Sequence, residues 1–285
     1  MSNDMDYQIK SPMGIDISAW ERTINWNVLS PRPLLVIAKA SEYKWEDAYL
    51  TEHWKNMTIF GAPRGAYHFF RANDVQAQVD KYLAQCRLVG ALVNGVWKAE
   101  IPPILDAEYA PPATPKKKPK GWVSPPRGTQ LAGQYKTWLD LVEKATGVRP
   151  IIYTNINYWN YTHDWLGKPP SWTRDYKLWL AYYPDRKDDF PLPTKAMLPA
   201  GWLLEDVVMW QYAEDGRLVG IPYDGVDLNW ISPAWLESLG VEPPTPVSMS
   251  VELDWDEGDQ AKSEFYANVT RVEMIFADGG KVVRP

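Results

Sequence analysis

The feature that most constrains the fold is a repeated alternation of short apolar segments with amphipathic helical segments along residues 14–240. Several apolar segments are continuous hydrophobic runs, which is typical of parallel strands covered on both faces. Eight such strands with interspersed helices favour a closed α/β barrel over an open sheet. The expected strands are residues 14–18, 34–39, 65–69, 103–108, 150–154, 177–181, 207–211 and 225–229.

Two helical segments have apolar faces that repeat with the period of an α-helix. These faces are Val75, Val79, Tyr82, Leu83 and Cys86 in the first, and Leu131, Tyr135, Trp138, Leu139 and Val142 in the second. Gly147 ends the second helix. From the sixth strand onward the gaps are short or irregular, so we expect the last helices of a regular barrel to be missing.

The composition argues against several classes of protein. The net charge of -6 disfavours general binding to nucleic acid. No run approaches the roughly 20 apolar residues that a membrane span needs. The single cysteine, Cys86, allows no intrachain disulfide, and with only three histidines a His/Cys zinc site is not expected. The 16 tryptophans are expected to fill the core and, in a minority, to line a cleft where flat rings bind sugars.

The two ends of the chain differ from the barrel segment. Residues 1–13 form an N-terminal extension, and residues 1–10 lack the basic and apolar regions of a signal peptide. Residues 241–246 read VEPPTP, the composition of a stiff linker. Residues 247–285 alternate between apolar and polar residues around two turns, which predicts a short C-terminal β-element. Self-association and docking to another protein are both open as roles for this tail.

Asp106 and Glu108 carry the clearest chemical signal, because they lie two apart at the end of an apolar strand. Such residues project to the same side with Cα atoms about 6.5 Å apart. The carboxyl end of a barrel strand is where active sites lie. Repulsion between two carboxylates raises the pKa of one of them, and glycoside hydrolysis needs one protonated and one ionised carboxyl group. The alternative is an ordinary salt-bridged or solvated strand end.

Asp16 and Asp227 sit at equivalent places in the first and last expected strands. These strands are neighbours in a closed barrel, so both side chains should face the cavity that holds Asp106 and Glu108. Taken singly, each could be an aspartate of a turn or helix cap.

At this point the sequence resembles the glycoside hydrolase family 25 lysozymes, often called the Chalaropsis type. The resemblance runs in order from residue 14 to residue 232. The matching segments are GIDIS (14–18), KASE (39–42), GAYHFF (65–70), ILDAE (104–108), PIIYTN (150–155), LWLAYY (178–183), MWQY (209–212) and DGVDLN (224–229).

The resemblance implies a flattened TIM-like barrel of five β/α units followed by three β-strands. It implies cleavage of the β-1,4 bond between N-acetylmuramic acid and N-acetylglucosamine in bacterial peptidoglycan, with retention. By motif position, Glu108 would be the general acid and then the base for water. Asp106 would orient the 2-acetamido group of the substrate, and Asp16 and Asp227 would complete the acidic floor. No metal or cofactor is implied.

Further positions match the family's cleft as substrate-binding residues. They are Glu42, Tyr67, Tyr153, Tyr183, Trp210 and Tyr212. For each aromatic residue taken singly, core packing is the alternative, and for Glu42 it is an ion pair with Lys39. His68 follows Tyr67 in the strand, so it should point the opposite way and act as a hydrogen-bonded structural residue.

Two departures from the family pattern stand out. Tyr43 occupies the place of a glycine after KASE, so the turn should differ and crowd the cleft. Residues 110–128 are rich in proline and basic residues and directly follow the catalytic strand. This segment is either a solvated loop or a basic flap that contacts anionic groups of the wall.

Two other functions remain open. One is a catalytically silent barrel that binds glycans or has a structural role, and the other is a chitinase-like hydrolase. The absence of a signal peptide suits a phage endolysin made in the host cytoplasm, a lytic part of a phage particle, or a secreted autolysin whose leader has been removed. In each setting the protein acts on the cell wall.

Overall fold

The computed structural model describes residues 10, 12–110, 115–118, 123–163, 167–184, 191–222 and 225–242, and the backbone of 272–275 and 281–284. The chain divides into two compact units, Met1–Val241 and Glu242–Pro285. In the second unit, strands β12 (Val272–Ile275) and β13 (Lys281–Arg284) pair as an antiparallel hairpin. The rest of the expected tail strands and residues 243–246 of the expected linker lie outside the described residues.

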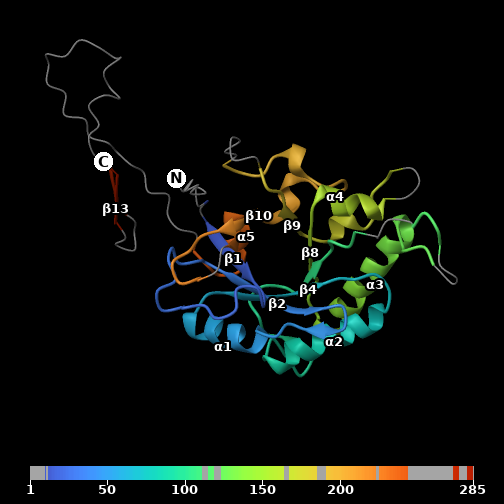
Figure 1. Cartoon of the computed structure of the whole chain (residues 1–285), viewed down its shortest axis with the longest axis horizontal. Coiled ribbons are helices and arrows are strands. Elements are labelled where there is room, and N and C mark those ends of the chain that lie inside the picture. Colours follow the sequence, from blue (N-terminus) through green and yellow to red (C-terminus); the bar gives the residue numbers. More distant parts are fainter. Residues whose placement is uncertain are drawn as a thin grey trace, which may run out of the picture. The chain divides into compact units, whose positions relative to one another are not determined.

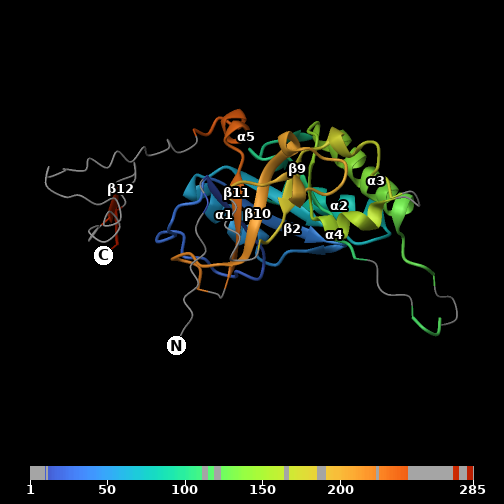
Figure 2. The same cartoon turned by 90° about the horizontal axis from the view of Figure 1, so that it is seen from above.

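The first unit is built on eight strands that close into a barrel (Figures 1 and 2). The strands are β1 (Met13–Ile17), β2 (Val36–Glu42), β4 (Arg64–Phe69), β7 (Ile104–Asp106), β8 (Ile151–Thr154), β9 (Leu178–Ala181), β10 (Val207–Gly216) and β11 (Val226–Ile231). All eight strands expected from the sequence are present, and the prediction of an α/β barrel is confirmed.

The barrel is mixed, because its last strand runs against the others. Strands β1, β2, β4, β7, β8, β9 and β10 pair in parallel in that order. Strand β11 pairs antiparallel with both β10 and β1 and thereby closes the barrel. Two short hairpins are added, β3 (Trp45–Glu46) on β2, and β5 (Leu92–Val93) with β6 (Val96–Trp97).

Helices follow the middle strands of the barrel and lie outside it. In Figure 1, α1 (Leu50–Phe60), α2 (Val75–Leu88) and α3 (Gly128–Thr146) form a row along one side. The β1–β2 connection, residues 18–35, has turns in place of a helix. After β8 the helices are short: α4 (Ile156–Trp159), α5 (Pro233–Ser238), and the 3-10 turns η1 (Asn160–Thr162), η2 (Thr173–Asp175), η3 (Lys195–Met197) and η4 (Leu204–Asp206). None of the helices in the described ranges is long and apolar enough to cross a membrane.

Neighbouring residues of several strands belong to two different apolar clusters. Ile104, Ile151 and Met209 belong to one cluster, which fills the barrel interior. Their strand neighbours, such as Leu105 and Trp210, belong to the larger cluster that includes the buried residues of α2 and α3. This period of two decides which side chains can reach the mouth of the barrel.

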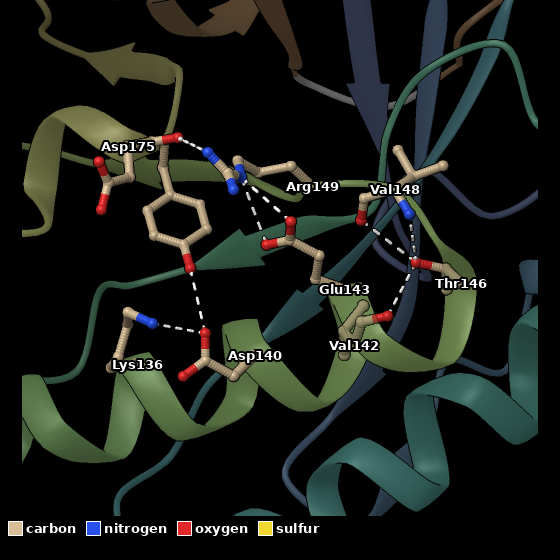
Figure 3. A network of polar contacts seen from close by, with 9 residues as sticks. Lys136, Asp140, Val142, Glu143, Thr146, Val148, Arg149 and Asp175 are labelled. Atoms are coloured by element: carbon tan, nitrogen blue, oxygen red, sulfur yellow. Dashed lines mark hydrogen bonds and ion pairs between the residues drawn. The ribbon is translucent and has the colours of Figure 1, made fainter.

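Polar contacts fix the end of α3 against the start of β8 (Figure 3). Arg149 Nε lies 3.1 Å from Glu143 Oε1 and donates to it. The Thr146 hydroxyl donates to the Val142 carbonyl at 2.8 Å. Gly147 follows with φ of 71°, a left-handed conformation that ends the helix at the expected residue.

A buried histidine joins β4 to the helical layer. His68 is fully buried, stacks on Trp138 with ring centroids 5.6 Å apart, and contacts Ser41 Oγ through Nδ1 at 2.9 Å. Its Nε2 contacts Gln78 Oε1 at 3.0 Å. Burial lowers the pKa of His68 to about 4, so the ring is neutral near pH 7. The structural role expected for His68 agrees with this environment.

Gln78 on α2 is the shared partner of this network. Its side-chain oxygen also accepts from the Arg71 N–H at 3.0 Å, and its Nε2 donates to the carbonyl oxygens of Arg71 and Asn73 at 2.5 and 2.6 Å. One buried amide therefore ties Arg71 and Asn73 of the β4–α2 connection to α2.

We predict that Gln78→Leu lowers the free energy of unfolding by about 2–4 kcal/mol, because several buried polar groups lose their partner. Chemical denaturation would measure this change. The matched control is Gln76→Leu in the same helix, whose exposed amide donates to Asp80 at 2.8 Å. We expect this control to stay within about 0.5 kcal/mol of wild type. Equal losses in the two variants would contradict the role of Gln78.

Candidate active site

A cleft of about 890 Å³ opens at the carboxyl ends of the parallel barrel strands. The structure places all four carboxyl groups expected from the sequence in its lining. They are Asp16, Asp106, Glu108 and Asp227. They come from β1, from β7 and the residues after it, and from β11, so only the closed barrel brings them together.

Asp16 and Asp227 are direct partners in the β1–β11 register. Asp16 is buried and accepts hydrogen bonds from Gln211 Nε2 at 3.0 and 3.2 Å and from Asn229 Nδ2 at 2.7 Å. Burial raises the pKa of Asp16, although these donors favour its ionised form. Burial and the neighbouring Asp16 raise the pKa of Asp227 well above its ordinary value.

Asp106 is the last residue of β7 and faces the cleft from the barrel floor. It pairs with Phe69 of β4 and Tyr153 of β8. Its side chain is 4% exposed, and its Oδ1 is buried without a hydrogen-bond partner. Burial, followed by repulsion from Glu108, raises the pKa of Asp106 well above its ordinary value.

Glu108 lies two residues beyond Asp106, in a segment fixed by β8. The Ala107 N–H donates to the Tyr153 carbonyl at 2.8 Å, and the Ala107 carbonyl accepts from Thr154 Oγ1 at 2.9 Å. Burial raises the pKa of Glu108 to about 7, and the negative charges of Asp16 and Glu214 act in the same direction. Glu108 is therefore a carboxyl group that can hold a proton near neutral pH.

Gln211 is a central residue of the site that the sequence reasoning missed. Its Nε2 donates to Asp16, while its Oε1 accepts from the hydroxyl groups of Tyr153 and Tyr183, each at 2.5 Å. It thus connects one carboxyl group to two tyrosines of the cleft. The available signal was the two-residue period of the strand, since Gln211 follows the inward-facing Met209.

The expected aromatic residues divide into two groups. Tyr67, Tyr153 and Tyr183 line the cleft, and so does Trp179, which the sequence reasoning had not selected. Trp179 packs edge-on against Tyr153 at 4.6 Å and donates from Nε1 to Asn229 Oδ1 at 2.7 Å.

The other aromatic group belongs to the core. Trp210 and Tyr212 are buried on the opposite face of β10 from Gln211, and neither lines the cleft. Trp210 Nε1 donates to the Tyr182 carbonyl at 2.7 Å. The core-packing alternative therefore describes their position, and we do not assign them to substrate.

Glu42 also lies outside the cleft lining. It forms ion pairs with Lys39 at 2.6 Å and with Arg71 at 2.5 Å. Of the two interpretations left open for Glu42, the geometry favours the ion pair, and Lys39 is the member of this pair that reaches the cleft.

The two departures from the family pattern have different outcomes. Tyr43 adopts the turn itself, with φ of 50°, and its ring packs on Trp45 at 5.3 Å. It is not among the residues that line the cleft, so the expected crowding is not observed. In the basic segment 110–128, residues 111–114 and 119–122 lie outside the described residues. The side chains of Lys116, Lys117 and Lys118 are described, and all three are exposed.

The site is a carboxyl and tyrosine site in chemical character. Within the described ranges, no group of three or more His, Cys, Asp and Glu side chains has an arrangement that could hold a metal ion. What the cleft can supply is a proton donor, hydrogen-bond acceptors and aromatic surface.

Comparisons with known proteins agree with this geometry. A family model described as Glycosyl hydrolases family 25 matches residues 15–221. Lysozyme M1 of Streptomyces globisporus is 29% identical over 235 residues, which cover 76% of this chain and 66% of that protein. The Escherichia coli K12 protein described as Uncharacterized protein YegX is 29% identical over 215 residues, covering 73% and 65%. The matches thus span just under two thirds of the length of these two curated relatives.

Solved structures show the same barrel. The bacterial lysozyme from Streptomyces coelicolor matches with a TM-score of 0.61 and 27% identity, over 82% of this chain and 98% of that one. A family 25 glycosyl hydrolase from Bacillus anthracis matches with a TM-score of 0.60 at 20% identity, over 85% and 99%, which shows the fold alone. Because the family model matches well over half of the sequence, the chain belongs to glycosyl hydrolase family 25.

Proposed function

We propose that the protein is an N-acetylmuramidase that cleaves the β-1,4 bond between N-acetylmuramic acid and N-acetylglucosamine of bacterial peptidoglycan, with retention. The observation that carries the proposal is a cleft with four carboxyl groups in which burial raises the pKa of Glu108 to about 7. Membership of family 25 and the identity to Lysozyme M1 support it. The reaction takes place at the cell wall, where this substrate lies.

In this proposal Glu108 donates its proton to the glycosidic oxygen as the bond to the anomeric carbon breaks. The oxygen of the substrate's 2-acetamido group attacks that carbon from the opposite face, so no enzyme nucleophile is needed. Glu108, now ionised, then takes a proton from the water that opens the intermediate. Two inversions at the anomeric carbon give net retention of its configuration.

Asp106 orients the acetamido group. Its carboxyl group lines the cleft and can accept a hydrogen bond from the acetamido N–H. That bond favours the ionised form of Asp106, while Glu108 keeps the proton that it must donate.

Asp16, whose hydrogen bonds favour its ionised form, supplies negative potential beneath the developing positive charge of the sugar ring, and Asp227 lies beside it as the carboxyl group that favours its protonated form. Gln211 and Asn229 keep Asp16 in place through their hydrogen bonds. Tyr153 and Tyr183, held by Gln211, present their hydroxyl oxygens to the substrate.

We predict that Glu108→Gln lowers kcat on purified peptidoglycan by about 10²–10⁴-fold, because the amide keeps the packing but cannot supply the proton. Muropeptide analysis would detect new reducing-end muramic acid with wild type alone. The control Glu52→Gln changes an exposed carboxyl group of α1 and should keep the wild-type rate.

Other results of this digestion would overturn the assignment. Equal products from wild type and Glu108→Gln would show that Glu108 is not the acid. No products from wild type on several walls would favour the silent glycan-binding barrel, and preferential cleavage of chitin would favour the chitinase-like reading.

We predict that kcat/KM falls as pH rises through about 7, since Glu108 must be protonated in the free enzyme. Initial rates on soluble glycan strands would give the profile. Glu214→Gln should move the high-pH limb to lower pH, because Glu214 is an exposed negative charge that raises the pKa of Glu108. High salt should shrink this shift. A high-pH limb at the same pH in wild type and Glu214→Gln at low salt would contradict the electrostatic coupling between Glu214 and Glu108.

We predict that Glu108→Gln is more stable than wild type at pH 8, by about 1–3 kcal/mol. The folded pKa of about 7 exceeds the reference value of 4.5, so the wild type loses stability as pH rises between these values. The amide has no such loss. Urea unfolding at pH 8 and pH 5 would measure the difference, which should shrink at pH 5. An unchanged difference at the two pH values would argue against linkage to this carboxyl group.

A further inference from the structure

One wall of the cleft is the loop that follows β1, and it carries an exposed tryptophan. Trp20 lines the cleft and is 83% exposed. Among the tryptophans with described side chains, only Trp20 and Trp45 are more than half exposed, whereas most of the others are buried. A single exposed apolar ring is common on protein surfaces, but Trp20 lies in the lining of the cleft, where a bound ligand would cover it.

The loop that carries Trp20 is held firmly without the help of its indole. The Ser18 N–H donates to Glu21 Oε2 at 2.6 Å, and the Trp20 N–H donates to Ser18 Oγ at 3.2 Å. The Ala19 N–H donates to Asp47 Oδ2 at 2.9 Å. These contacts fix the backbone on both sides of Trp20, so little backbone entropy is lost when a ligand covers the ring.

The far end of the same loop is anchored in the helical layer. Arg22 adopts a φ of 47°, a left-handed conformation that is uncommon for this residue type. Its carbonyl accepts from Nε2 of the buried His53 of α1 at 2.7 Å. The loop is therefore a rigid extension of the barrel rim.

The size and character of the cleft indicate which ligand would cover the indole. Its volume of about 890 Å³ is near the upper end of the roughly 300–1,000 Å³ range of ligand sites, which suits a ligand of several rings. The C–H face of a pyranose ring is apolar and flat enough to stack on an indole, while its hydroxyl groups remain free to hydrogen-bond. Carboxyl groups in the same lining, such as Glu214 and Asp47, are acceptors for such hydroxyls.

We propose that Trp20 forms a binding subsite for a pyranose ring of the glycan strand, beyond the sugars that flank the cleaved bond. The inference rests on the proposed muramidase function and specifies its substrate further. On this proposal the enzyme prefers long strands, because the sugar that stacks on Trp20 belongs to the same strand as the two sugars at the cleaved bond.

The test compares kcat/KM of wild type and Trp20→Ala on uncrosslinked strands of alternating N-acetylglucosamine and N-acetylmuramic acid, sorted by length. The two enzymes should be equal on the shortest strand that is cleaved, and Trp20→Ala should be about 10-fold worse on long strands. Trp20→Tyr, which keeps an aromatic face, should recover most of the loss. Trp45→Ala is the matched control, because Trp45 is also exposed but does not line the cleft.

Two results would overturn the subsite while leaving the muramidase proposal intact. In the first, wild type and Trp20→Ala have equal kcat/KM on strands of every length. In the second, kcat/KM of Trp20→Ala is lower than that of wild type by the same factor at every length. If wild type cleaves no strand, the muramidase proposal fails and calorimetric titration with the same strands decides on the subsite. Weaker binding by Trp20→Ala would then support it, and equal binding or none would overturn it.

Discussion

The two-sided pairing of β1 is the constraint on which the rest of the structure depends. This strand of five residues pairs in parallel with β2 and antiparallel with β11, and it thereby turns an open sheet into a barrel. Without this closure Asp16 and Asp227 would lie on opposite edges of the sheet, far from each other and from Asp106. The site is therefore a property of the closed barrel and of no single segment.

Closure also creates the electrostatic character of the cleft. Four carboxyl groups are brought into a region of low dielectric, where burial raises the pKa of each. The protein offsets part of the repulsion with neutral donors, since Gln211 and Asn229 satisfy Asp16, and leaves one oxygen of Asp106 unsatisfied. This concentration of buried carboxyl groups costs stability.

Much of the fold and of the carboxyl set could be predicted from the sequence, for identifiable reasons. Continuous apolar runs revealed the strands, and the D-x-E spacing at the end of one of them pointed to Asp106 and Glu108. The aromatic residues were harder to assign, because a motif such as MWQY does not indicate which of its residues face the barrel interior. The inward position belongs to Gln211, and its neighbours Trp210 and Tyr212 pack in the core. Hydrogen bonds across the barrel, and the exposure of Trp20, depend on tertiary packing that no local pattern encodes.

The hydrogen bonds that hold Asp16 join parts of the chain that are very distant in sequence. The partners Gln211 and Asn229 lie 195 and 213 residues after Asp16. On a ribosome, which delivers the N-terminal end first, Asp16 emerges long before either partner has been synthesised. A nascent chain that ends before β11 cannot assemble the cleft, whatever its other strands have formed. The proposed hydrolytic activity would thus appear only when translation has passed the last strand of the barrel. Incomplete chains that end before this strand would have no hydrolytic activity.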